Sequence, residues 1–378
     1  MIGIDGISLS IPRFYLDLAT LAARHQQPVA KYYEGIGQEK MAVVPPDEDI
    51  VTLAVKAARP LINAENRQKI STLLFATESA IDQSKAAGIY VQKLLQLPAN
   101  LRVVELKQAC YSATAALQMA RALVALQPDS QVLVIASDVA KYDLDSTAEA
   151  TQGAGAVAML VAKNPRLLAL GPISGCYSED VMDFWRPNGR KTPLVDGRFS
   201  TLMYLKALEN ALNHYKSQGG NNLDNLAAHC YHLPFTKMGL KAHQRLCKLT
   251  GQPYREEDCT AAMSYNRQIG NCYSASLYLS LCSLLDNNDD LAGREIGLFS
   301  YGSGAVAEFF TGQVQENYRQ FLQRERHRQL LAQRQQLSYE EYLQFWPGPD
   351  DSADQEIADS ASGAPRLAAI EAHKRLYQ

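Results

Sequence analysis

The chain has 378 residues, of which 47% are hydrophobic and 20% are charged, and its net charge is −3. This composition indicates a folded protein of two to three domain-sized units. It argues against a general nucleic-acid binder, which needs an excess of positive charge. No apolar run approaches the roughly 18 residues that span a bilayer. We therefore expect neither a nucleic-acid partner nor a membrane partner.

The seven cysteines are scattered and form no C-x-x-C pair. The pattern predicts neither a zinc ribbon nor a thioredoxin-like site, and we expect no metal site. An odd number of cysteines in a chain of this length is typical of the reducing cytosol. No basic segment precedes an apolar one at the N-terminus, so we expect no signal peptide and a cytoplasmic location.

Along the first half, apolar strand-like runs alternate with amphipathic helical runs. The sequence predicts a helix over 50–61 that Pro60 distorts, strands over 71–76, 102–106, 131–136 and 156–162, and a helix over 113–126. The strand runs are apolar without alternation, as in strands that are covered on both faces. This order predicts an α/β fold.

The second half repeats the pattern, with strands expected over 226–231 and 295–300 and a helix over 274–285. Cys110-Tyr111-Ser112-Ala113 matches Cys272-Tyr273-Ser274-Ala275, and residues 153–158 match residues 302–307 in the same order. These matches indicate duplication of one βαβ-type half, with chance similarity of small-residue segments as the alternative. After residue 312 the sequence predicts an exposed helix over 313–337 and a flexible acidic loop over 347–365.

Cys110 lies where a predicted strand ends and a predicted helix begins. The unpaired N–H groups and the dipole of a helix N-terminus favour a thiolate, so we expect a lowered pKa and a nucleophile. The same N–H groups can hold the oxyanion of an attacked thioester. Cys272 has the same local form, and a buried structural cysteine is the alternative, so position alone does not decide between the two.

Further candidates follow predicted strands in both halves. Glu78 follows the strand predicted over 71–76, where partial desolvation favours acid–base chemistry, although a solvated loop residue is the alternative. His232 holds the equivalent place in the second half, as a proton donor or as a structural histidine. Asn271 can bind a carbonyl or cap a helix. Residues 302–304 (Gly-Ser-Gly) let the backbone approach a ligand, and Lys237 and Lys241 are phosphate contacts or solvated lysines.

Seven ordered segments resemble the 3-hydroxy-3-methylglutaryl-CoA synthase family of the thiolase superfamily. They cover residues 35–38, 76–79, 107–111, 151–155, 183–187, 232–238 and 301–304. The resemblance extends over about residues 1–312. It implies a five-layered αβαβα fold from two duplicated halves, over 1–167 and 168–312, followed by a C-terminal helix and acidic tail over 313–378.

The resemblance also implies the chemistry. It makes Cys110 the nucleophile, Glu78 the general acid/base and His232 the histidine that binds the acetoacetyl group. Tyr142, Asn271 and Ser303 line the acyl pocket, with Thr151 and Gly302 beside them, and Lys237 and Lys241 contact CoA. The implied enzyme is a homodimer of the mevalonate pathway that condenses acetyl-CoA with acetoacetyl-CoA and needs no other cofactor.

Gln108 departs from the family pattern, because many mevalonate-pathway members carry an acidic residue at this position. Glutamine occurs there in relatives that build β-branches on polyketides bound to a carrier protein. Such a synthase is therefore the alternative function, and a non-catalytic thiolase-like scaffold is the second alternative.

Overall fold

A nine-stranded sheet passes through the computed structural model, which describes residues 1–220 and 223–378. In spatial order its strands are β11 (His229–Tyr231), β12 (Glu295–Gly302), β13 (Val306–Val314), β8 (Leu168–Ser178), β1 (Ile2–Ser10), β7 (Gly153–Lys163), β6 (Gln131–Ala140), β4 (Ile70–Ala76) and β5 (Arg102–Leu106). Strand β4 is parallel to both β5 and β6, and β11 is parallel to β12, whereas the other neighbours in the sheet are antiparallel.

The sheet consists of two halves that meet at a narrow junction between β1 and β8. Only Gly3 with Ala169 and Ile4 with Leu168 are paired there. Gly3 is required at this crossing, because a Cβ atom would lie 2.0 Å from the carbonyl oxygen of Leu168. The first half therefore contains β1, β7, β6, β4 and β5, and the second contains β8, β13, β12 and β11.

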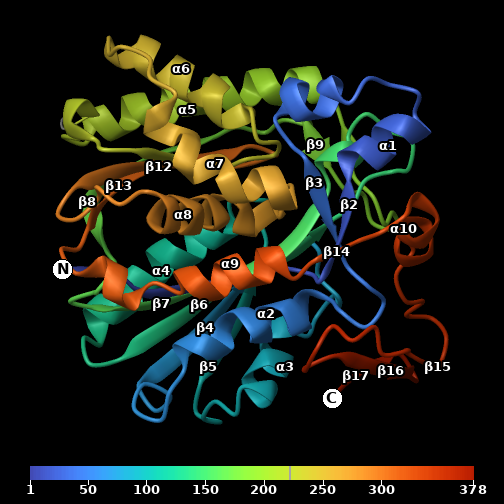
Figure 1. The fold of residues 1–378 in the computed structure, drawn as a ribbon. Coiled ribbons are helices and arrows are strands. Elements are labelled where there is room, and N and C mark those ends of the chain that lie inside the picture. The colour runs from blue at the N-terminus through green and yellow to red at the C-terminus, as the bar shows by residue number, and fades with distance from the viewer. Residues whose placement is uncertain (221–222) are drawn as a thin grey trace.

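Helices complete five layers, which Figure 1 shows from top to bottom. The helices α5 (Gly197–Ser217) and α6 (Met238–Thr250) cover the second half of the sheet, and α2 (Ile50–Ala58) and α3 (Ala87–Leu94) cover the first. Between the two halves lie α4 (Ser112–Leu126) and α8 (Ser276–Asn287), with α7 (Glu257–Ile269) packed against α8. Buried residues of α4 and α8 share one hydrophobic cluster with strands of both halves. This central layer is where the two halves are held together.

The α/β prediction is confirmed, and the predicted strands and helices up to residue 312 correspond to elements of the structure. Helix α2 ends at Ala58, and Pro60 lies in a single 3₁₀ turn, Arg59–Leu61, as its ring geometry requires. Strands β1, β8 and β13 were not predicted. β1 contains two glycines and an aspartate, so it lacks the apolar run by which the other strands were recognised.

One segment, residues 109–126, which contains α4, is long and apolar enough to cross a membrane by length and composition alone. The expectation that no apolar run approaches this length is therefore wrong. The physical reason is that α4, within this segment, lies between the two halves of the sheet and needs apolar side chains on more than one face. The central position of α4 thus accounts for its hydropathy.

A second, smaller sheet joins the N-terminal region to the C-terminal region. It contains β14 (Gln335–Gln336), β2 (Phe14–Asp17) and β3 (Lys40–Val43), next to α1 (Leu18–Arg24) and α10 (Tyr339–Phe345). A short hairpin, β9 (Phe184–Trp185) with β10 (Leu194–Val195), precedes α5. The helix expected over 313–337 is wrong at both ends, because β13 continues to Val314 and α9 covers only Arg324–Ala332.

The end of the chain forms a three-stranded sheet of β15 (Gln355–Glu356), β16 (Leu367–Glu371) and β17 (Lys374–Tyr377). The segment over 347–365 was expected to be a flexible loop, but it is fixed to the loop before α2. Ser360 and Ser362 donate hydrogen bonds to the carboxylate of Asp47, and Arg375 pairs with Asp49 at 2.9 Å. These partners are more than 300 residues away in sequence, so local composition could not predict them.

Candidate active site

Cys110 occupies the turn between β5 and α4. The preceding residue, Ala109, has a φ of +43°, which is uncommon for a residue with a side chain and sharpens the turn. Gly302, at the end of β12, presses against this turn, since a Cβ atom there would lie 2.6 Å from the carbonyl oxygen of Gln108. Gln108 in turn donates a hydrogen bond to the carbonyl oxygen of Ser303 at 3.3 Å. The cysteine of the first half is therefore in contact with a strand end of the second half.

The thiol of Cys110 donates a hydrogen bond to Oε2 of Glu78 at 3.2 Å. Glu78 is buried, and its burial together with the nearby Asp138 carboxylate raises its pKa to about 8. Burial and the Glu78 carboxylate also raise the pKa of the Cys110 thiol. The expected lowering of this thiol pKa is wrong, because desolvation and a neighbouring negative charge outweigh the helix N-terminus. The resting site therefore holds a neutral thiol and a carboxyl group that is ready to gain or lose a proton near neutral pH.

Asp138, on β6, positions Glu78. Its fully buried carboxylate accepts six hydrogen bonds, from Thr77 Oγ1, the N–H groups of Glu78 and Ser79, Ser79 Oγ, and the N–H and Oγ of Ser274. The first four donors belong to the loop that carries Glu78, and the last two belong to Ser274 in the 3₁₀ turn that precedes α8. One carboxylate thus ties the general acid/base candidate to the central helix of the other half.

His232 follows β11 and is buried, with its backbone N–H bonded to the carbonyl oxygen of Phe299 at 2.9 Å. Its ring stacks on Tyr204, whose hydroxyl donates to the His232 carbonyl oxygen at 2.8 Å. Burial lowers the pKa of His232 to about 3. The imidazole is therefore neutral at physiological pH, and it can polarise a carbonyl as a hydrogen-bond donor but not as a cation.

The residues expected to line an acyl pocket lie around Tyr142. The ring of Tyr142 packs edge-on against Phe184 and Tyr273, and Cys110 packs against the same cluster. Oδ1 of Asn271 accepts from Tyr273 N–H at 2.9 Å and so caps the turn before α8, while its Nδ2 lies 3.5 Å from the Tyr142 hydroxyl. The helix-capping role predicted as one alternative for Asn271 is present, and its amide N–H₂ still faces the pocket.

The remaining candidates lie farther out. Thr151 is half-buried, and its carbonyl oxygen accepts from Asn271 N–H at 3.0 Å. Lys237 packs against Gly37, where a Cβ atom would lie 2.9 Å from the lysine Cγ. Lys241 is exposed on α6, with its Nζ 5.2 Å from the centre of the Phe235 ring. Neither lysine has an ion pair within the described part of the chain, so both are available to a phosphate.

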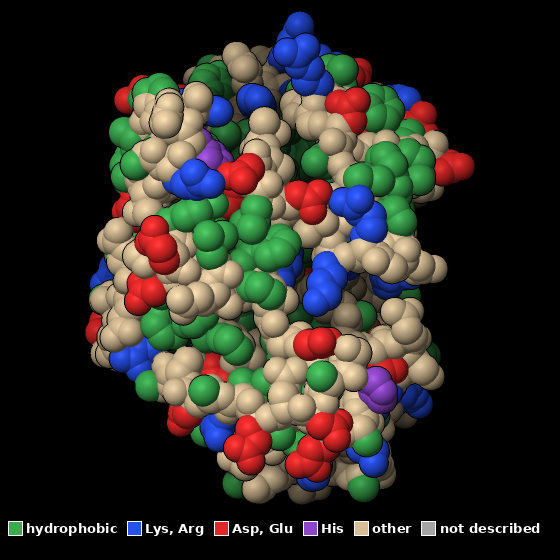
Figure 2. Space-filling view, turned by 90° about the vertical axis from the view of Figure 1, so that its right-hand side faces the viewer, with side chains coloured by type: hydrophobic (Ala, Val, Ile, Leu, Met, Phe, Trp, Pro, Cys, Tyr) green, Lys and Arg blue, Asp and Glu red, His purple; other side chains and the backbone are tan. Residues whose placement is uncertain are grey.

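A cavity of about 900 Å³ reaches Glu78 from another side. Basic and aromatic residues line it, among them Lys107, Lys141, Arg186, Lys191 and Trp346, whereas Cys110 and His232 do not. Figure 2 shows lysine and arginine side chains beside hollows in the middle of the face that carries α10, with acidic side chains toward its lower end. Burial lowers the pKa of Lys141 to about 8. This cavity opens onto the base candidate but not onto the nucleophile.

Sequence reasoning missed Asp138, although it left a signal. It is a lone carboxylate inside the otherwise apolar stretch of β6, and a charge in such a place is rarely buried without partners. Tyr273 and Phe184 were also missed as pocket residues, because their approach to Tyr142 depends on the meeting of the two halves.

Two family models match the chain. The family model described as hydroxymethylglutaryl-coenzyme A synthase N terminal matches residues 1–165. The model described as hydroxymethylglutaryl-coenzyme A synthase C terminal matches residues 169–252 and 246–347.

Two curated relatives illustrate the range. A hydroxymethylglutaryl-CoA synthase from Enterococcus faecalis is 45% identical over 365 residues, which cover 95% of each chain. The polyketide biosynthesis 3-hydroxy-3-methylglutaryl-ACP synthase PksG from Bacillus subtilis is 35% identical over 375 residues, covering 92% of this chain and 88% of that protein.

Solved structures show the same thiolase-like fold. An HMG-CoA synthase complexed with CoA superposes with a TM-score of 0.95 at 40% identity, covering 100% of this chain and 99% of the other. The HMG synthase of the curacin biosynthetic pathway gives a TM-score of 0.93 at 33% identity, with the same coverage.

We predict that Asp138→Asn lowers the free energy of unfolding by about 1–3 kcal/mol. The reason is that the NH₂ group of asparagine would face N–H and O–H donors that now bond to a carboxylate oxygen. Urea unfolding measures this loss. The exposed Asp129→Asn is the matched control and is expected to stay within about 0.5 kcal/mol of the parent. Equal stabilities of the two variants would contradict the role assigned to Asp138.

Proposed function

The chain belongs to the hydroxymethylglutaryl-CoA synthase family, and on that premise we propose that it condenses acetyl-CoA with acetoacetyl-CoA through an acetyl-Cys110 intermediate. The product is 3-hydroxy-3-methylglutaryl-CoA, for the mevalonate route to isoprenoids. The observation that carries the proposal is the 3.2 Å contact between Cys110 Sγ and Glu78 Oε2. This contact places a nucleophile next to an acid/base, and the two chemical steps of the reaction require both.

The first step exchanges one thioester for another. Sγ of Cys110 attacks the acetyl carbonyl of acetyl-CoA, the C–S bond to CoA breaks, and the departing thiolate takes up the proton that the Cys110 thiol gives up. The N–H groups at the start of α4 stabilise the oxyanion that forms during the attack. The step leaves acetyl-Cys110 and free CoA, with no net change in charge.

The second step forms the carbon–carbon bond. Glu78 removes a proton from the acetyl methyl group, and backbone N–H groups of Cys110 and Ser303 hold the enolate oxygen. The enolate carbon attacks the ketone of acetoacetyl-CoA, which the neutral His232 polarises by a hydrogen bond. Glu78 then returns its proton to the new alkoxide. Water finally attacks the thioester carbonyl at Cys110 and the C–S bond breaks. One proton of the water restores the thiol, and the other leaves to solvent as the product carboxyl group ionises. We assign no cofactor beyond the CoA thioesters.

Pocket residues and outlying lysines complete the assignment. The acyl group is enclosed by Tyr142, Asn271 and Thr151. Residues 302–303 approach the turn that carries Cys110. Lys237 and Lys241 bind the phosphates of CoA, an assignment supported by their lack of ion pairs among the described residues.

The alternative acceptor is an acyl group bound to a carrier protein. Gln108 and the likeness to PksG and to the curacin synthase favour this alternative. Both acceptors carry a phosphate that the two lysines can bind, so enzyme kinetics must distinguish a CoA-bound acceptor from a carrier-bound one. Saturation by free acetoacetyl-CoA supports the CoA-dependent synthase, and turnover only with a carrier-bound β-ketoacyl group supports the alternative. A non-catalytic scaffold would form no acyl adduct on Cys110.

We further propose a cytoplasmic homodimer. Strand β5 lies at an edge of the sheet, and its Val104 is 44% exposed, so its backbone groups and side chain are free to pair with a second copy. The seven free thiols suit a reducing compartment.

We predict that Val104→Lys shifts sedimentation toward a monomer, whereas Val29→Lys, at another exposed apolar position, does not.

The central test separates the two chemical steps. We predict that Glu78→Ala still forms the acetyl adduct with acetyl-CoA, because the departing CoA thiolate accepts the proton. Condensation is expected to fall by about 10² or more, because no other base is assigned to the methyl proton. Mass analysis of the protein after acetyl-CoA, and of the products after acetoacetyl-CoA, measures both.

Cys110→Ala is the control and is expected to lose the adduct itself. If Glu78→Ala lost the adduct as completely as Cys110→Ala, the separation of roles would be refuted. If both variants retained condensation, the proposed function itself would fail.

The pKa of Glu78 sets a pH dependence. Burial raises it to about 8, so the carboxylate that acts as base increases as pH rises through that value. The hydrogen bond from the Cys110 thiol lowers the pKa of Glu78. Acetylation of Cys110 removes this bond, so the pKa of Glu78 does not fall in the acetyl-enzyme. We predict that single-turnover condensation from preformed acetyl-enzyme accelerates between about pH 6 and 9. A rate that is independent of pH over this range would contradict the assignment of Glu78 as base.

A further inference from the structure

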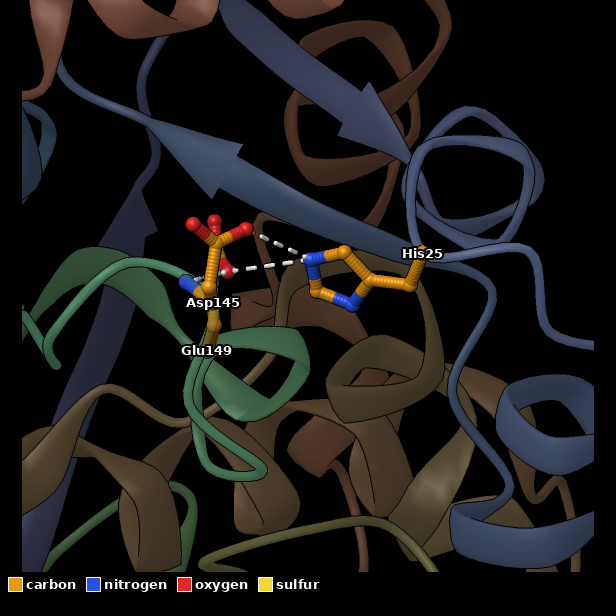
Figure 3. Close-up of side chains that lie close together, drawn as sticks. All are labelled: His25, Asp145 and Glu149. Carbon is orange, nitrogen blue, oxygen red and sulfur yellow. Dashed lines mark hydrogen bonds and ion pairs between the residues drawn. The ribbon is translucent and has the colours of Figure 1, made fainter.

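A histidine and two carboxylates converge at a point outside the active site. His25 follows α1, and Asp145 and Glu149 belong to the connection between β6 and β7. Nε2 of His25 lies 3.2 Å from Asp145 Oδ1 and 3.6 Å from Glu149 Oε2. Figure 3 shows the imidazole edge pointing toward both carboxylates. One ligand atom from each residue lies within 4.8 Å of the other two.

The three ligand atoms differ in their access to water. The Glu149 side chain is fully buried, that of His25 is 18% exposed, and that of Asp145 is 63% exposed. Nε2 of His25 is itself buried and has no hydrogen-bond partner. A buried nitrogen that faces two carboxylates needs a cation between them, either a proton or a metal ion. Asp145 leaves a path by which an ion can enter.

Outer partners hold the side chains of His25 and Glu149 in place. Nδ1 of His25 lies 3.3 Å from the Tyr32 hydroxyl, which can accept its proton and leave Nε2 with a free lone pair. Oε1 of Glu149 accepts from the Tyr342 hydroxyl at 3.0 Å. Partners of this kind orient metal ligands in known sites. Oε2 of Glu149 also accepts a hydrogen bond from the backbone N–H of Asp145 at 2.7 Å. Arg24 forms no ion pair with either carboxylate in the described part of the chain, so each carboxylate keeps an oxygen lone pair for an ion.

We propose that His25, Asp145 and Glu149 bind one divalent first-row metal ion, for which Zn²⁺ is the probe. Tetrahedral zinc with nitrogen and oxygen ligands places the ligand atoms about 3.4 Å apart, close to the two separations from Nε2. One imidazole and two carboxylates suit such an ion, and water takes the remaining position on the exposed side. The ligands come from distant parts of the chain, so no short sequence motif predicts the site.

The site connects to the acyl pocket through hydrogen bonds. Tyr342, which donates to Glu149, accepts from Gln152 Nε2 at 2.8 Å. Oε1 of Gln152 accepts from the backbone N–H of Tyr142 at 2.8 Å. An ion at Glu149 thus fixes the outer end of a chain whose inner end is Tyr142. We assign the ion a structural role, which the proposed reaction does not require.

The test uses the full chain after removal of metal by a chelator. Calorimetric titration with Zn²⁺ is expected to show one site per chain, and the thermal midpoint is expected to rise with added Zn²⁺. His25→Ala and Asp145→Asn are each expected to weaken binding by about tenfold or more. The matched controls are His373→Ala and Asp354→Asn, at exposed positions of the C-terminal sheet, and both should bind as the parent does.

A cysteine is the competing ligand, and two further measurements exclude it. Cys110→Ser should bind Zn²⁺ with unchanged affinity. Co²⁺ should give d–d bands without the charge-transfer band of a thiolate ligand. A thiolate band, or binding by His25→Ala and Asp145→Asn at parental affinity, would overturn the proposal. Absence of any binding by the parent chain would leave a simple ion pair at this position and would equally overturn it. None of these readouts depends on enzymatic turnover.

Discussion

The carboxylate of Asp138 is the interaction on which the site depends. It is fully buried and accepts hydrogen bonds from the Glu78 loop with one oxygen and from Ser274 with the other. Both halves of the molecule satisfy this carboxylate, because its donors belong to both. The same negative charge contributes to the high pKa of Glu78. Burial raises this pKa most and Asp138 raises it further, so Asp138 contributes to both the position and the proton affinity of the acid/base candidate.

Burial is also the dominant influence on the other two catalytic candidates. It raises the pKa of the Cys110 thiol and lowers that of His232 to about 3, so all three groups favour their neutral forms. A helix N-terminus would favour the opposite for the cysteine, but its effect is smaller than the cost of desolvating a charge beside Glu78. Charge on these three groups therefore appears only as the substrate reacts, where fixed dipoles can stabilise it.

Much of the fold and part of the site were predictable from the sequence, for identifiable reasons. The buried strands β4, β6 and β7 are continuous apolar runs, and the repeated Cys-Tyr-Ser-Ala placed Cys110 and Cys272 at the starts of the two central helices. The local sequence pattern could not reveal that Cys110 is desolvated beside Glu78. This desolvation raises the pKa of the Cys110 thiol, which was expected to be lowered. Nor could the local pattern reveal the docking of the C-terminal sheet, which depends on Asp47 and Asp49 far away in sequence.

That docking has a consequence for how the protein is made. Trp346, Asp351 and Arg375 help to line the cavity that reaches Glu78, yet ribosomes synthesise them after both thiolase-like halves have been translated. While these residues are still in the ribosomal exit tunnel, the cavity beside the acid/base candidate Glu78 lacks one wall. The wall is therefore completed only after the C-terminal sheet has left the exit tunnel, later than the two thiolase-like halves.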